Sequence, residues 1–124
     1  MKTYKEYSES TKTQKKVAVI DFDGTICDHA FPECGEPKSG VAEALKKLQD
    51  KGYEIHILSC RTCVDLNKHP IDRREQIKTM EAYLNEHSIP YNVVLNKDKP
   101  IADVYIDDRA IGFRDNWDAI VESL

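Results

Sequence analysis

Short apolar runs alternate with amphipathic stretches along this chain, and this alternation constrains the fold more than any other feature. The apolar and β-branched runs predict four strands, over residues 17–22, 53–59, 91–95 and 102–107. Strands that alternate with helices form βαβ units, whose strands run parallel. We therefore expect an α/β fold, a three-layer α/β/α sandwich built around a Rossmann-like parallel sheet.

The first helix is expected over residues 40–51. Ser39 is its expected N-cap, and Gly52 follows it as a stop signal. Its apolar stripe has the spacing of one helix face and consists of Val41, Leu45 and Leu48.

Two more helices are expected in the second half of the chain. Asp72 and Glu75 have the spacing of a capping box. The helix that they precede has an apolar stripe of Ile77, Met80 and Leu84. A last helix should begin near Asp115, and we expect it to bury Trp117, Ile120, Val121 and Leu124.

Length and composition fit one small globular domain. The chain has 124 residues, of which 40% are hydrophobic and 32% charged, and its formal net charge is −4. This charge provides no overall basic field for nucleic acid or an anionic membrane. Residues 1–16 form a polar lead without the apolar centre of a signal peptide, and residues 17–124 form the expected catalytic domain. We expect a cytoplasmic protein that does not span a membrane.

Pairs of acidic residues follow two of the predicted strands. Asp21 and Asp23 come after the first strand and would point to the same side, and Asp107 and Asp108 come after the last. Ligands of parallel α/β sheets bind at the carboxyl ends of the strands. Clustered carboxylates repel one another unless a cation lies between them, and such oxygen ligands suit Mg²⁺. The alternative is that these aspartates only cap turns or helices.

Other side chains at the same edge are suited to holding a phosphate. Gly24 and Thr25 offer a flexible backbone with free N–H groups and a hydroxyl, and Ser59 ends the second strand with another hydroxyl. Lys99 would bring a positive charge to this edge, with Lys97 as its nearest competitor. The alternative for either lysine is a solvated position in a loop.

Four short motifs, in this order, resemble those of the haloacid dehalogenase superfamily. They are "DFDGTI", "HILS", "DKP" and "YIDDRA", and the resemblance covers residues 17–109. It implies that Asp21 is a nucleophile that forms an aspartyl-phosphate, and that Asp23 is the general acid and base. It also implies that Mg²⁺ is held by Asp21, the backbone carbonyl of Asp23, Asp107 and Asp108. Gly24, Thr25, Ser59 and Lys99 would hold the phosphoryl group.

The resemblance also indicates the type of reaction. Members of the superfamily that cleave carbon–halogen bonds lack the residue that corresponds to Asp23, whereas phosphatases have it. A receiver domain has similar chemical groups, but there the phosphorylated aspartate, the hydroxyl and the lysine follow the acidic pair. Here Ser59 and Lys99 precede Asp107 and Asp108, so the order does not fit.

No cap domain is expected. Neither the segment between Thr25 and the first helix nor residues 60–96 can hold a domain. The site should therefore be open unless the 26–38 loop or a second subunit covers it, and an oligomer is one way to cover it. The chain also resembles small bacterial and phage members and the phosphatase domain of phage-type polynucleotide kinase, which makes Arg61 and Arg109 candidate substrate contacts. A structural ion pair is the alternative for Arg109.

The cysteines leave two interpretations open. Cys60 and Cys63 have the spacing of zinc ligands, and Cys27 and Cys34 could join them if their strands are neighbours. Separate reduced thiols are the simpler interpretation, since disulfides are rare in the cytosol.

These features predict a Mg²⁺-dependent phosphatase that acts on a phosphorylated small molecule, such as a sugar phosphate or a nucleotide. A polynucleotide end is the alternative substrate. A phosphotransferase and a non-catalytic phosphate-binding module are the alternatives in function.

Overall fold

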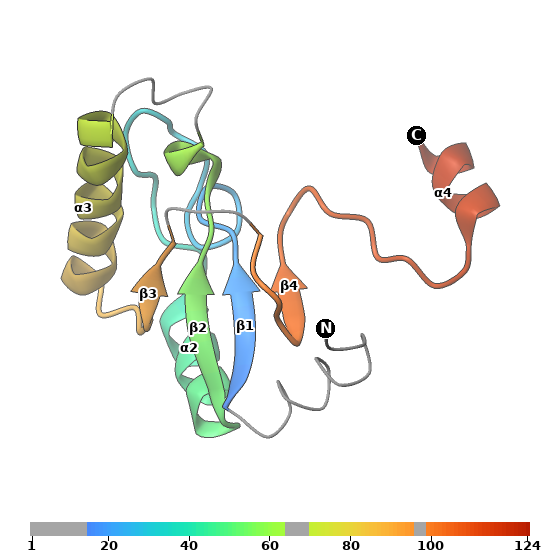
Figure 1. Cartoon of the computed structure of the whole chain (residues 1–124), viewed down its shortest axis with the longest axis horizontal. Coiled ribbons are helices and arrows are strands. Elements are labelled where there is room, and N and C mark those ends of the chain that lie inside the picture. Colours follow the sequence, from blue (N-terminus) through green and yellow to red (C-terminus); the bar gives the residue numbers. More distant parts are fainter. Residues whose placement is uncertain (1–14, 64–69, 96–98) are drawn as a thin grey trace, which may run out of the picture.

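The computed structural model describes residues 15–63, 70–95 and 99–124. Figure 1 shows the strands side by side, with their carboxyl ends at the same edge. The elements are β1 (Lys16–Ile20), α2 (Val41–Asp50), β2 (Tyr53–Ile57), the 3₁₀ helix η1 (Cys60–Thr62), α3 (Pro70–Glu86), β3 (Val93–Val94), β4 (Val104–Ile106) and α4 (Trp117–Ser123).

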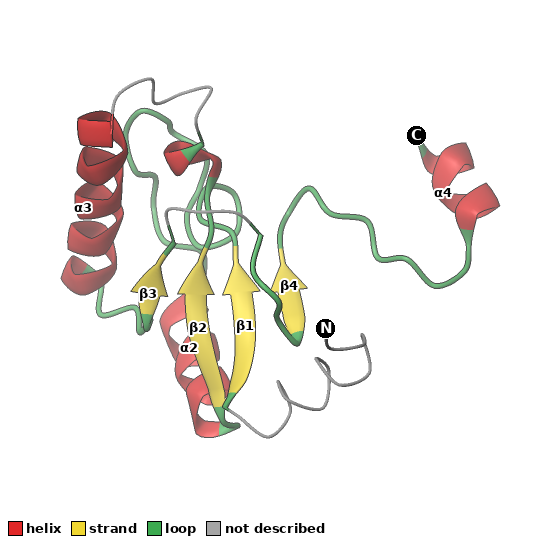
Figure 2. Cartoon of the chain, viewed as in Figure 1, coloured by secondary structure: helices red, strands yellow, loops and turns green. Residues whose placement is uncertain are grey.

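The four strands form one parallel sheet in the order β3-β2-β1-β4. This confirms the predicted α/β fold with a Rossmann-like parallel sheet. β1 lies between β2 and β4, so the chain segments that follow these three strands are neighbours in space. Figure 2 shows that the loops after β1 and β2 gather at this edge.

α2 and α3 cover the same face of the sheet. Ala18 and Ile20 of β1 pair with Ile55 and Ile57 of β2, and these four side chains are buried. Because alternate residues of a strand point to opposite faces, they form one surface. The core that they form includes Leu45 of α2 and the α3 residues Met80, Tyr83 and Leu84. The predicted apolar stripes of these two helices are therefore correct.

The opposite face of the sheet, toward the viewer in Figure 1, carries one row of side chains across all four strands. The row consists of Val93, His56, Val19 and Tyr105. Val93 and Tyr105, at the two ends of the row, are 38% and 42% exposed, whereas Val19 between them is buried.

Three expectations about helix ends and burial are wrong. α2 is preceded by Gly40 in the left-handed conformation, without a side-chain cap, so Ser39 is not the N-cap. α3 begins at Pro70, so Asp72 and Glu75 lie within it instead of preceding it. α4 buries none of its residues, and Trp117 is 67% exposed. The helical pattern was predicted correctly, but burial depends on a packing partner, and α4 stands away from the sheet (Figure 1).

The predicted lead of residues 1–16 lies mostly outside the described residues, so it stays a prediction. Among the helices in the described ranges, none combines the length and apolar character needed to cross a bilayer.

Candidate active site

The first acidic pair is held in place by the residue between its members. The Asp21 amide donates to the carbonyl of Ile106 at 2.9 Å and extends the pairing of β1 with β4. The Phe22 ring is fully buried and meets Tyr83 of α3 edge to face at 5.5 Å. Because Phe22 points into the core, its two neighbours Asp21 and Asp23 point toward the opposite side, where a cavity lies.

Three carboxylates meet at the carboxyl edge of the sheet. Asp21, Asp107 and Asp108 each offer one oxygen, and these oxygens all lie within 4.8 Å of one another. The Thr25 hydroxyl lies 3.4 Å from both Asp21 and Asp108, and it accepts a hydrogen bond from the Asp108 amide at 3.0 Å. The structure thus brings together both acidic pairs that the sequence placed after separate strands.

The electrostatics of this group fit a hard cation. The pKa of Asp21 is raised from 3.8 to about 6. Burial is the largest cause, and the neighbouring carboxyl groups of Asp108 and Asp107 contribute to the same rise. A hydrogen bond with His29 lowers the pKa of Asp108. Three carboxylate groups that offer oxygens this close together match the ligands that Mg²⁺ takes in proteins.

Arg61 binds the second aspartate of the first motif. Its Nε donates to Asp23 Oδ2 at 2.7 Å, and its Nη2 donates to Asp23 Oδ1 at 2.8 Å. The side chain of Arg61 is only 2% exposed. It was predicted as a substrate contact, but in this structure the guanidinium is engaged by Asp23. Such a two-pronged pair fixes both the position and the plane of a carboxylate.

The 26–38 loop folds over the same guanidinium. Arg61 donates to the carbonyls of Pro32 at 3.2 Å and Glu33 at 2.7 Å, and its guanidinium lies 4.9 Å from the Phe31 ring. The base of the loop is closed by hydrogen bonds from Asp28 to Glu36 and from Lys38 to Ile26. The loop is therefore a folded flap beside the site.

A cavity of about 420 Å³ joins these groups. Ser59 and Arg109, both predicted from the sequence, line it. The residues that line it are Asp21, Asp23, His29, Phe31, Ser59, Cys60, Arg61, Asp107 and Arg109. Its volume falls in the range of small-molecule sites, about 300–1,000 Å³.

Two residues at this cavity are not among the predicted site residues. His29 Nε2 lies 3.1 Å from Asp108 Oδ2, and Phe31 is exposed at the rim. Both lie in an irregular loop without periodicity, so their only signal was their closeness in sequence to Asp23.

Gly24 is required at its position for two reasons. Its φ is +88°, a conformation that residues with a Cβ rarely adopt. A Cβ there would also overlap His29 Nε2 and Asp108 Oδ2. The glycine therefore allows His29 and the carboxylates to approach the turn closely.

The structure does not bring Lys99 to the cavity. Its ammonium lies 4.6 Å from the centre of the Tyr105 ring, and the residue is exposed. Its role as a phosphate ligand stays a prediction, as does that of Lys97, which lies outside the described residues.

In the described part of the chain, the four cysteines do not come together as one group. Cys27 is buried, whereas Cys60 and Cys63 are exposed. Burial raises the pKa of Cys27 to about 11. Among the described residues, which include all four cysteines, the group close enough to share a metal is the three aspartates.

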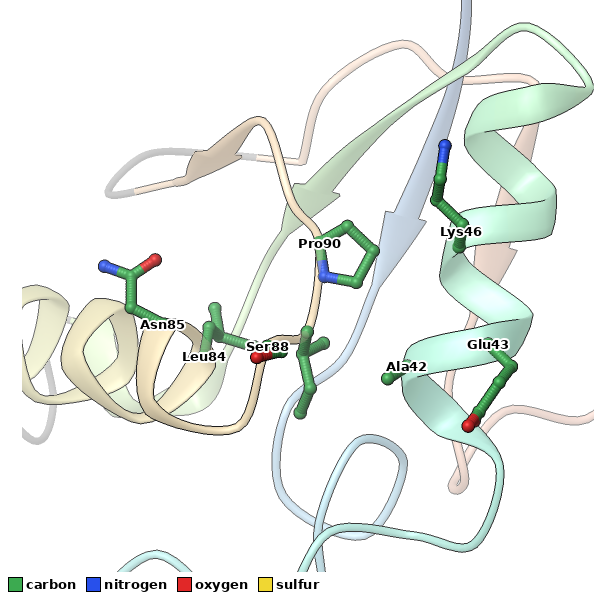
Figure 3. Close-up of a pocket in the computed structure, with 8 residues that line it drawn as sticks. Ala42, Glu43, Lys46, Leu84, Asn85, Ser88 and Pro90 are labelled. Atoms are coloured by element: carbon green, nitrogen blue, oxygen red, sulfur yellow. The ribbon is translucent and has the colours of Figure 1, made fainter.

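A second hollow lies on the helical face of the sheet, between α2 and the end of α3 (Figure 3). It is lined by Ala42, Glu43, Lys46, Leu84, Asn85, Ser88, Ile89 and Pro90. It contains none of the motif residues, so the chemistry described above belongs to the cavity at the carboxyl edge.

No protein-family model and no curated protein matches this chain. Two solved structures are similar to it. One is a conserved protein from Bacteroides thetaiotaomicron, with 26% identity, a TM-score of 0.56 and coverage of 88% of each chain. The other is a structural-genomics target from Vibrio cholerae, with 26% identity, a TM-score of 0.54 and coverage of 77% of this chain and 82% of that one. The similarity over most of the chain supports the α/β fold.

Proposed function

We propose that this chain is a Mg²⁺-dependent phosphatase of the haloacid dehalogenase type, acting through an aspartyl-phosphate on Asp21. The observation that carries the proposal is the meeting of Asp21, Asp107 and Asp108 within 4.8 Å, in a cavity that Asp23 also lines. The short motifs occur along the chain in the same order as in that superfamily. Their aspartates lie close together, which supports a single shared site.

In the first step, a carboxylate oxygen of Asp21 attacks phosphorus, and the bond from phosphorus to the leaving oxygen breaks. Asp23 enters this step protonated, with one of its oxygens released from Arg61, and gives its proton to the leaving oxygen. In the second step, Asp23 takes a proton from water, the water oxygen attacks phosphorus, and the bond between phosphorus and Asp21 breaks. The covalent intermediate divides one difficult hydrolysis into two easier displacements.

Asp21, Asp107 and Asp108, with the backbone carbonyl of Asp23, would hold Mg²⁺. The bound ion would offset the repulsion between the Asp21 carboxylate and the phosphate dianion. The hydroxyls of Ser59 and Thr25 are the phosphoryl-binding candidates at this edge. The amides of Gly24 and Thr25, which the sequence analysis expected to be free, donate within the turn to the carbonyls of Cys27 and Phe22. Arg61 is a positioning residue, since it acts on Asp23.

A phosphorylated small molecule is the proposed substrate class. A cavity of about 420 Å³ accommodates a sugar phosphate or a nucleotide. The net charge of −4 offers no broad basic surface to a polynucleotide. Arg109 at the cavity is the feature that would favour a polynucleotide end as the alternative.

The test is release of inorganic phosphate from sugar phosphates, nucleotides, end-phosphorylated oligonucleotides and an aryl phosphate, with Mg²⁺ or with EDTA. We expect release with Mg²⁺ and none with EDTA. Asp21→Asn should abolish release, and Asp50→Asn, an exposed change on α2, should leave it unchanged.

Two results would contradict the proposal. Full activity of Asp21→Asn would exclude the aspartyl-phosphate. Mg²⁺-dependent transfer to added alcohols without hydrolysis would identify a phosphotransferase instead, and the absence of both reactions across the panel would favour a binding module.

A further inference from the structure

His29 connects the flap to the group of three aspartates. Its Nε2 lies 3.1 Å from Asp108 Oδ2, and the residue lines the cavity. A carboxylate has no proton to give, so the imidazole is the donor in this hydrogen bond and its Nε2 carries the proton. The hydrogen bond with His29 is also the largest of the causes that lower the pKa of Asp108. It therefore favours the ionised form of Asp108, which is the form that binds a cation.

The two oxygens of the Asp108 carboxylate have different donors. Oδ2 accepts from His29 at 3.1 Å, whereas Oδ1 lies 3.4 Å from the Thr25 hydroxyl. That hydroxyl has one proton and lies equally far, at 3.4 Å, from Asp21 Oδ2, so it can serve only one of the two carboxylates at a time. A distance of 3.1 Å is within the usual range for an N–H donor, and 3.4 Å is beyond the usual range for a hydroxyl. The orientation of the Asp108 carboxylate thus depends more on His29 than on Thr25.

The backbone on both sides of this hydrogen bond is arranged to permit it. A Cβ on Gly24 would overlap His29 Nε2 and Asp108 Oδ2, which are the two atoms that the bond joins. The main chain beside His29 is fixed at the base of the flap, where the Asp28 amide donates to the Glu36 carbonyl at 2.8 Å. The contact is therefore held by ordered backbone, unlike a chance meeting of two surface side chains.

We propose that His29 is a positioning residue, which fixes the direction of Asp108 and so sets the Mg²⁺ affinity of the three aspartates. This inference rests on the proposed function, because it assumes that Asp21, Asp107 and Asp108 hold Mg²⁺. A hydrogen bond that orients a ligating carboxylate before the ion binds removes the cost of ordering that side chain during binding. Loss of such an outer partner typically lowers metal affinity by about 10- to 100-fold.

The test measures Mg²⁺ binding to the full chain by titration calorimetry, without any substrate. His29→Leu removes the donor and should raise the Mg²⁺ dissociation constant by about 10- to 100-fold. His29→Gln keeps an N–H donor at the end of a side chain of similar length, so it should bind Mg²⁺ more tightly than His29→Leu. The side chain of His29 is 52% exposed, so neither change empties the core, and thermal melting in EDTA checks that both variants fold.

The matched control is the same substitution at a second histidine. His87 lies near the end of α3, is exposed and does not line the cavity at the carboxyl edge. His87→Leu should bind Mg²⁺ like the wild type. The control separates the loss of the hydrogen bond to Asp108 from a general effect of replacing a histidine by leucine.

A double variant shows whether His29 acts through Asp108. In Asp108→Ala the carboxylate that His29 orients is absent, so adding His29→Leu should change the Mg²⁺ dissociation constant little. Added to the wild type, the same substitution should produce the full loss. This difference is the signature of a positioning residue, since a group that itself contacts the cation would lose the same affinity in both backgrounds.

Each of the other outcomes overturns the inference. Equal Mg²⁺ affinity in His29→Leu and the wild type would show that His29 does not position Asp108, and the proposed function would stand. Tighter binding in His29→Leu would show that His29 competes with the cation for Asp108. Equal losses with and without the Asp108 carboxylate would show that His29 acts directly on the cation. Absence of Mg²⁺ binding by the wild type would overturn the proposed function as well, so the two failures are distinguishable.

Discussion

Arg61 donates two hydrogen bonds to the carboxylate of Asp23, at 2.7 and 2.8 Å, although 38 positions separate the two residues in the chain. The same guanidinium lies 5.3 Å from the centre of the Phe22 ring and 4.9 Å from the centre of the Phe31 ring. It therefore ties the first motif, the flap and the end of β2 into one unit. If Asp23 is the general acid and base, its alignment depends on Arg61.

Arg61→Gln should lower both stability and turnover. Removing one partner of a buried ion pair leaves the other without compensation and costs about 3 kcal/mol, and misplacing a reacting group costs about 100-fold in turnover. Arg61→Lys keeps the charge but loses the two-pronged geometry, so it should rescue stability more than turnover. Chemical denaturation and steady-state kinetics measure the two effects. Arg109→Gln, at an exposed position, is the control for stability. Wild-type turnover in Arg61→Lys would contradict a positioning role.

Gly24→Ala should reduce turnover by about 100-fold, because the new Cβ would displace His29 and Asp108 from the turn. Gly40→Ala is a matched control: its φ is +75°, but its Cβ would meet nothing within 4 Å. Both variants have similar backbone strain, so the difference between them reports the contact at the site. Equal kinetics in the two variants would show that the crowding around Gly24 has no functional consequence.

The metal-free protein should lose stability as the pH rises from about 4 to 6. The pKa of Asp21 is raised to about 6 in the folded state from 3.8, so the folded state binds the proton more tightly. The stabilisation of the folded state by that proton is complete below pH 3.8 and disappears above about pH 6. Asp21→Asn has no such proton, so it should be more stable than the wild type at pH 7 in EDTA.

Thermal melting at several pH values measures this difference. The gap between Asp21→Asn and the wild type should narrow as the pH falls from 7 to 4. A difference in melting temperature that stays constant over this range would show that folding does not raise the pKa of Asp21.

Mg²⁺ should raise the melting temperature of the wild type, because a ligand that binds only the folded state stabilises it. Asp107→Asn removes a charged ligand from the group of three. This variant should need at least about tenfold more Mg²⁺ than the wild type to reach the same rise in melting temperature. Asp50→Asn should respond like the wild type. If Asp107→Asn and the wild type respond alike, the three aspartates are not the binding site. This readout does not require the natural substrate to be known.

Much of the fold was determined by local sequence. The runs that became β1 and β2, and the stripes of α2 and α3, follow from side-chain periodicity, which is set by the geometry of each element alone. The motif aspartates were likewise predictable, because parallel strands bring their carboxyl ends to one edge whatever the details of packing. The meeting of Asp21 with Asp107 and Asp108 needed nothing beyond that topology.

The remaining features depend on where distant segments come to lie. The pairing of Arg61 with Asp23 and the approach of His29 to Asp108 are contacts across an irregular loop, and no sequence spacing encodes them. The exposure of α4 is of the same kind. Its apolar stripe was visible in the sequence, but burial is a property of two surfaces, and only the tertiary structure decides whether the second one is present in the same chain.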